Sequence, residues 1–138
     1  GWIVFSQILH CLATLKLWGV ALGRLQHEPS LGLLWLALGA EDFVQTQTTP
    51  EQLPDIIDEI LMNIPEAKMI LLLYQDPQTL THYQALLRVF TGTDARLIAK
   101  QFNPQGSAHA VAFAVPAANL LDAVKTVKEG IANFVQQK

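Results

Sequence analysis

Apolar stretches alternate with short polar turns along the chain, and the length of each stretch predicts a secondary-structure element. The clearest strand covers residues 69–74, six consecutive apolar residues between two prolines. An uninterrupted apolar run of this length is typical of a strand that is buried on both faces and lies centrally in its sheet. Shorter or less regular apolar runs predict further strands over residues 2–5, 18–26, 31–39, 95–102 and 108–115.

Helices are predicted where apolar residues recur three and four positions apart. One such helix can start at Thr49, because Thr49 can cap it, Pro50 suits its first turn and Gln52 follows the capping residue by three positions. Pro54 would remove one hydrogen bond from a helix that already includes Pro50, so a start near Leu53 is the alternative. Another opens after Asp76, whose carboxylate can accept hydrogen bonds from the free amides of a first turn. The predicted helices cover residues 5–15, 49–64, 76–90 and 118–135.

The order of these elements occurs twice. Residues 5–61 follow the series helix, strand, turn, strand, helix, and residues 79–135 follow it again. We therefore expect one domain over residues 1–138, made of a pseudo-repeat of residues 1–66 and 67–138.

The strand–helix–strand–strand–helix order resembles the ferredoxin-like class of α+β folds. That class includes amino-acid-sensing regulatory domains, PII-type signalling proteins and the shell proteins of bacterial microcompartments. The segment from Ile70 to Gly130 has the shell-protein order of elements, with a turn at Gly106-Ser107 and a closing helix that ends in glycine. The resemblance implies a two-layer α/β sandwich of two duplicated ferredoxin-like halves, and it assigns no functional residue.

Composition points to association with a partner. Of the 138 residues 51% are hydrophobic and only 15% are charged, so we expect apolar surface to be covered by another subunit, another domain or a membrane. Among these we predict a homo-oligomer. The net charge of −3 and the scattered nine lysines and arginines argue against nucleic-acid binding. The single cysteine, Cys11, excludes an internal disulfide and argues against a thiolate metal site.

The N-terminal stretch, residues 2–23, is apolar enough to raise the question of a membrane span. Lys16 lies near its middle, and a lysine at the centre of a span costs about 2.5–3.5 kcal/mol. The run over residues 31–40 is shorter than the roughly 20 residues that a span needs. We therefore expect a helix followed by a strand rather than a span, and a cytoplasmic location.

Residues able to do chemistry are few. No dinucleotide-binding, phosphate-loop, serine-nucleophile or paired-carboxylate motif is present. His109 shares a predicted strand face with apolar residues, which suits either a core histidine or a ligand-binding one. Arg24, Arg96 and Lys100 belong to predicted hairpin strands, where an anionic ligand could lie. We expect His109, Arg96, Lys100 and Arg24 to be the ligand-binding residues, with no cofactor and no metal.

Alanine occupies every even position of the strand predicted over residues 108–115. Because side chains alternate across a strand, one face of it becomes a flat alanine strip. Such a strip fits either tight packing against a helix of the same chain, or a subunit interface or the floor of a ligand cleft.

The pattern favours a non-catalytic, self-associating module that binds a small molecule or builds an assembly. A small cofactor-free enzyme that uses His109 or His27 is the alternative, and membrane association through residues 2–23 is a third hypothesis.

Overall fold

The computed structural model describes residues 2–64, 67–77 and 83–136. Within these ranges the chain forms an α+β domain with one six-stranded mixed sheet, in the order β1-β2-β3-β4-β6-β5, and five α-helices. The strands are Gln26–Glu28 (β1), Leu33–Leu38 (β2), Met69–Gln75 (β3), Tyr83–Val89 (β4), Gln105–Gly106 (β5) and Ala110–Val115 (β6). The helices are Trp2–Gly23 (α1), Ala40–Thr46 (α2), Leu53–Asn63 (α3), Ala95–Ile98 (α4) and Leu120–Gln136 (α5). Short 3-10 turns cover Pro29–Leu31 (η1), Pro50–Gln52 (η2) and Lys100–Phe102 (η3).

The sheet is mixed because one strand pair is parallel. β2 and β3 run side by side in the same direction, from the pair Leu33 and Met69 to the pair Leu38 and Tyr74. All the other pairs are antiparallel. β3 lies inside the sheet, and its first five residues are buried. The prediction of a central, doubly buried strand over residues 69–74 is therefore confirmed.

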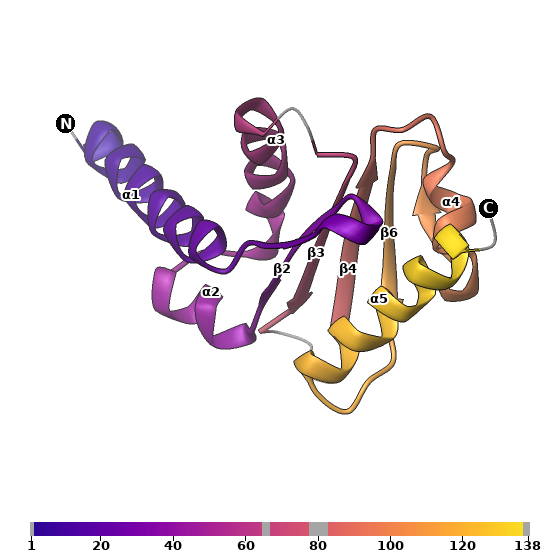
Figure 1. Ribbon diagram of the computed structural model, residues 1–138. Coiled ribbons are helices and arrows are strands. Elements are labelled where there is room, and N and C mark those ends of the chain that lie inside the picture. The colour runs from indigo at the N-terminus through magenta and orange to yellow at the C-terminus, as the bar shows by residue number, and fades with distance from the viewer. Residues whose placement is uncertain (1, 65–66, 78–82, 137–138) are drawn as a thin grey trace.

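Helices cover the sheet from both sides. Figure 1 shows α1, α2 and α3 on one side and α5 on the other. The first side has a core in which Leu17, Phe43 and Ile57 pack with the even-numbered residues of β3. On the second side, Val127 and Ile131 of α5 pack with the odd-numbered residues of β3 and with β4 and β6. The alternation of side chains along β3 thus supplies both cores.

The prediction of a helix over residues 76–90 is wrong where the structure describes it. Residues 83–89 form β4, and they alternate strictly between buried and half-buried positions. Tyr83 and Leu87 fit helical spacing, but together with Ala85 and Val89 they also fit the two-residue period of a strand. Pairing with β3 on one side and β6 on the other decides between the two periods.

The strand predicted over residues 95–102 is also wrong, because these residues form α4 and η3. The strand segments predicted over residues 2–5 and 18–26 are replaced by α1, apart from the three-residue β1 that begins at Gln26. Strands predicted over 31–39 and 108–115, and helices over 49–64 and 118–135, are confirmed within a few residues at their ends.

The structure does not show the expected duplication. The first half begins with the helix α1 and contains the edge strand β1 and its neighbour β2, whereas the second begins with the antiparallel pair β3 and β4. The ferredoxin-like order of elements is therefore absent from the described part of the first half. Among the described helices, none has both the length and the apolar character that a membrane crossing demands.

The alanine strip is not packed under a helix. Val111, Phe113 and Val115 of β6 are buried toward α5, while on the other face Ala112 is half-buried and Ala114 is exposed. A hollow of about 170 Å³ lies over Ala112, bordered by the first turn of α3. The interpretation as tight packing against a helix of the same chain is therefore wrong for this face.

Candidate functional site

Three of the four predicted ligand-binding residues come from one connected segment at one end of the sheet. Arg96 lies on α4, Lys100 on η3, and His109 directly before β6. The backbone N–H of Ala95 donates to the carbonyl of Ala108 over 2.7 Å, which ties the start of α4 to the turn before β6. The segment therefore lies where β4 ends and β6 begins.

Asp94 holds the first part of this segment together. Its Oδ1 accepts a hydrogen bond from the backbone N–H of Arg96 over 2.9 Å and another from the Nε of Arg96 over 3.0 Å, and its Oδ2 accepts from Nη2 over 2.8 Å. These hydrogen bonds, with the positive charge of Arg96 and a further contribution from His109, lower the pKa of Asp94. The carboxylate is therefore ionised at neutral pH and lies within electrostatic reach of both Arg96 and His109.

His109 is exposed and precedes the strand. The interpretation as a core histidine is therefore wrong. Arg96 and Lys100 do not lie on the hairpin strand predicted for them. They lie on α4 and η3, and both are exposed. Arg96 and His109 both lie near Asp94, because the chain turns back between η3 and β6, which the spacing of a single strand does not predict.

Lys100 borders a pocket of about 530 Å³ between η3 and α5. Its polar lining comes from Lys100, Gln101, Asn103 and Asn133, and none of the described residues that line it is acidic. Gly130 of α5 makes the close approach possible, because a Cβ at this position would lie 2.4 Å from Nε2 of Gln101. The pocket therefore offers amide groups and one positive charge.

Acidic residues are absent from the stretch of sequence that follows Asp94. Residues 95–121 contain no aspartate or glutamate, although the whole chain has a net charge of −3. The same stretch supplies Arg96, Lys100 and His109. Asp94 directly precedes this stretch and offsets the charge of Arg96. We call the residues Arg96, Lys100 and His109 the basic segment.

Arg24 lies elsewhere, at a cleft of about 780 Å³. The cleft is lined by Gly39, which directly follows the parallel strand β2, and by Gln75, the last residue of β3. Glu41 and Asp42 of α2 also line it. In open α/β sheets this carboxyl edge of parallel strands is a common place for ligands. The structure therefore separates Arg24 from the basic segment, at the opposite end of the sheet.

Sequence reasoning missed the two carboxylates that orient these arginines, Asp42 and Asp94. Each had a local signal. Asp94 precedes the apolar positions of α4 as a capping residue, and Asp42 follows Gly39 by three positions, where its Oδ2 accepts the Gly39 N–H over 2.8 Å.

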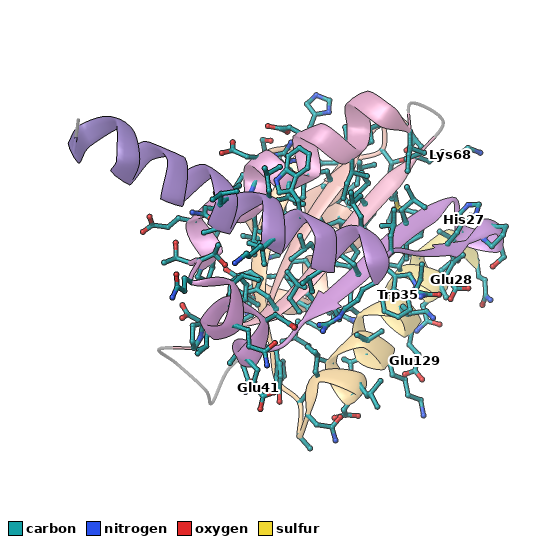
Figure 2. The ribbon with its side chains drawn as sticks, turned by 90° about the vertical axis from the view of Figure 1, so that its left-hand side faces the viewer. His27, Glu28, Trp35, Glu41, Lys68 and Glu129 are labelled. Atoms are coloured by element: carbon teal, nitrogen blue, oxygen red, sulfur yellow. The ribbon has the colours of Figure 1, made fainter. Side chains whose placement is uncertain are left out.

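The adjacent residues His27 and Glu28 do not form a joint site. His27 is exposed, whereas the Glu28 carboxylate accepts a hydrogen bond from Nζ of Lys128 over 2.6 Å, which lowers the pKa of Glu28. Lys128 also lies 4.8 Å from the centre of the Trp35 ring, and Figure 2 shows Glu28 and Trp35 close together beside α5. Glu28 therefore fastens the edge strand β1 to α5. The described residues contain no group of three His, Cys, Asp or Glu side chains placed to hold a metal ion.

Comparisons with known proteins identify the fold. No protein-family model matches the chain, and a search of curated proteins finds no match. An exopolyphosphatase-related protein from Bacteroides fragilis superposes on 88% of this chain with a TM-score of 0.75 and 16% sequence identity. The pGpG-specific phosphodiesterase PggH from Vibrio cholerae superposes on 96% of it with a TM-score of 0.58 and 12% identity. The chain spans only 35% and 40% of the lengths of these two proteins. It therefore has a fold that forms part of larger phosphoesterase-related proteins.

Proposed function

We propose that this chain is a ligand-recognition domain for phosphorylated molecules, acting as the non-catalytic part of a phosphoesterase-related protein. The observation that carries this proposal is the basic segment, because it places three cationic or protonatable side chains after Asp94, on a stretch of 27 residues, 95–121, that contains no aspartate or glutamate. The fold shared with an exopolyphosphatase-related protein and a phosphodiesterase supports a ligand with several phosphate groups or a phosphodiester bond.

Arg96 is suited to phosphate binding although it pairs with Asp94. An arginine has five N–H donors, and Asp94 accepts from two of the side-chain nitrogens. The side chain of Arg96 is 55% exposed, so the remaining donors can meet a ligand from solvent. Asp94 fixes the direction of the guanidinium, which reduces the entropy lost when a phosphate binds.

The arrangement favours recognition over catalysis. Catalysis of phosphoester cleavage needs a group that activates or orients the attacking oxygen. The carboxylate that adjoins the basic segment, Asp94, already accepts three hydrogen bonds from Arg96. What the segment supplies is positive charge and hydrogen-bond donors, which hold a phosphate without breaking its ester bond.

Binding is tested by calorimetric titration with two probes, inorganic polyphosphate and the linear dinucleotide pGpG. We expect the wild-type chain to bind at least one of them, and the double variant Arg96→Ala, His109→Ala to lose at least about tenfold in affinity, or about 1.4 kcal/mol. Lys125→Ala is the matched control, since it removes one exposed positive charge from α5. The proposal is wrong if wild-type chain binds neither probe, or if the control loses as much affinity as the double variant.

The same samples test the enzyme alternative. Phosphate release or formation of GMP from these probes should stay at the level of buffer alone. Release that depends on His109 would replace the recognition role by a catalytic one.

A further inference from the structure

One side of α1 is apolar and uncovered. Leu17 and Ala21 have no exposed surface, because they pack against the body of the domain. On the outer side Leu12 is 49% exposed, Leu15 61% and Leu22 50%. Three leucines exposed to this degree on one side of a helix leave apolar surface in contact with water, which is unfavourable.

The outer residues follow the spacing of a coiled coil. Leu12, Leu15, Gly19 and Leu22 are separated by three, four and three positions, and all four are exposed. This is the a and d pattern of a heptad repeat, in which two helices pack side by side. In the sequence, Phe5 and Ile8 continue the same spacing toward the start of α1. We call Leu12, Leu15, Gly19 and Leu22 the outer stripe.

The position of α1 leaves the outer stripe accessible. In both views the N-terminal part of this helix extends beyond the sheet and the other helices (Figure 1 and Figure 2). Its contacts with other elements are concentrated on α2 and β2. The exposed outer stripe and the projecting N-terminal part of α1 therefore leave this side of the helix open to a partner.

We propose that the outer stripe is a homodimer interface, at which α1 packs against α1 of a second copy of this chain. A heptad stripe is self-complementary, because its a and d side chains fit between those of an identical stripe. Lys16 is the one charged residue between positions 2 and 23, so charge does not select a different partner. Lys16 also directly follows a d position, where its aliphatic stem can lie over the seam while its ammonium group stays in water.

The available area suits a dimer. The backbone of α1 is about 33 Å long and, with side chains, such a helix is about 10 Å wide, so half of the lateral surface of two helices of this length amounts to about 1,000 Å². That is about the smallest area expected of a specific interface between proteins. The outer stripe, residues 12–22, runs along half of the length of α1. The pair of helices therefore provides a modest interface, and we expect dissociation to be measurable by dilution. The proposal does not depend on the phosphate-binding role of the basic segment.

Sedimentation equilibrium of the full chain tests the interface. We expect the mass of two chains at about 10 µM, and we expect Leu15→Glu to raise the dimer dissociation constant at least about 100-fold, since it places a charge in the apolar seam. Leu121→Glu is the matched control, because Leu121 is 81% exposed and lies on α5. Circular dichroism establishes that both variants are folded.

A second variant should strengthen the dimer. Nothing lies within 4 Å of a Cβ built on Gly19, so Gly19→Leu can fill the gap in the outer stripe and is expected to lower the dissociation constant about tenfold. A wild-type chain that stays monomeric at this concentration would overturn the proposal. The proposal would also be overturned if the control Leu121→Glu dissociated as readily as Leu15→Glu. It would likewise be overturned if the chain were a monomer that co-sediments with phosphatidylcholine vesicles through the leucines of the outer stripe.

Discussion

Arg24 and Asp42 form a two-pronged ion pair that joins the end of α1 to the first turn of α2. Nη1 of Arg24 donates to Oδ2 of Asp42, and Nη2 donates to Oδ1 over 2.7 Å. Asp42 is only 7% exposed, whereas the side chain of Arg24 is 46% exposed. The buried partner is thus a carboxylate, and it depends on an arginine that reaches in from solvent.

Replacing Arg24 by alanine should destabilise the fold. The change leaves a largely buried carboxylate without its counter-ion, and the partial exposure of Arg24 limits the loss to about 2 kcal/mol. Urea unfolding measures it. Arg88→Ala is the matched control, because Arg88 pairs with Asp58, whose side chain is 57% exposed, and we expect that change to cost about 0.5 kcal/mol. Equal losses of unfolding free energy for the two variants would contradict the idea that the burial of Asp42 makes its ion pair the more important one.

Gly106 is required by the turn between β5 and β6. Its φ is 143°, and a Cβ there would lie 2.2 Å from the carbonyl oxygen of Ala110. Gly106→Ala should therefore cost more than about 2 kcal/mol. Gly92 also has a positive φ, 81°, but nothing lies within 4 Å of its Cβ, so Gly92→Ala should cost only about 1 kcal/mol. Thermal unfolding of both variants separates the cost of the contact between the new Cβ and the Ala110 carbonyl oxygen from the cost of backbone strain alone. If Gly106→Ala is as stable as Gly92→Ala, the contact with Ala110 does not contribute.

The elements that the sequence predicts correctly are those whose pattern has one interpretation. A run of apolar residues fixes β3, and apolar positions along only one side fix α3 and α5. β4 is misread because Tyr83 and Leu87 are compatible with both periods, and its pairing with β3 and β6 is not visible from the segment alone.

The candidate site is less predictable for a similar reason. The sequence marks Arg96, Lys100 and His109 as candidate binding residues. It predicts a strand around Arg96 and Lys100, however, where the structure has α4 and η3. Their actual arrangement depends on Asp94 starting α4, and on the hydrogen bond between the backbone of Ala95 and Ala108. Arg24 is not part of the basic segment, because it follows the long helix α1 and lies at the other end of the sheet.

The titration of Asp94 reports directly on the basic segment. Hydrogen bonds from the Arg96 side chain and backbone hold its pKa below the ordinary value of 3.8. A carboxyl with a lowered pKa in the folded state stabilises the fold above its unfolded pKa, and that contribution is lost as pH falls through the lowered value. The stabilisation should therefore be complete above about pH 3.8 and disappear in more acidic solution.

Arg96→Ala should raise the pKa of Asp94 toward 3.8 without reaching it, because the backbone N–H at position 96 still donates to Oδ1. Carbon-13 NMR of the Asp94 carboxyl during an acid titration gives the midpoint. Lys125→Ala serves as the control and should leave the midpoint unchanged. A midpoint that does not move in the Arg96 variant would mean that the guanidinium does not hold the carboxylate in solution.

Two alanines on neighbouring strands test which face of the sheet is open. Ala85 of β4 has no exposed surface and lies beside Phe113 and Leu73, in the core under α5. Ala114 of β6 is exposed on the opposite face. Ala85→Leu adds three carbons to a filled space and should cost about 1–3 kcal/mol, whereas Ala114→Leu should change the free energy of unfolding by less than about 0.5 kcal/mol. Chemical unfolding compares them. A large loss from Ala114→Leu would show that another part of the protein closes over the alanine face, and the hollow above Ala112 would then be interior space rather than accessible surface.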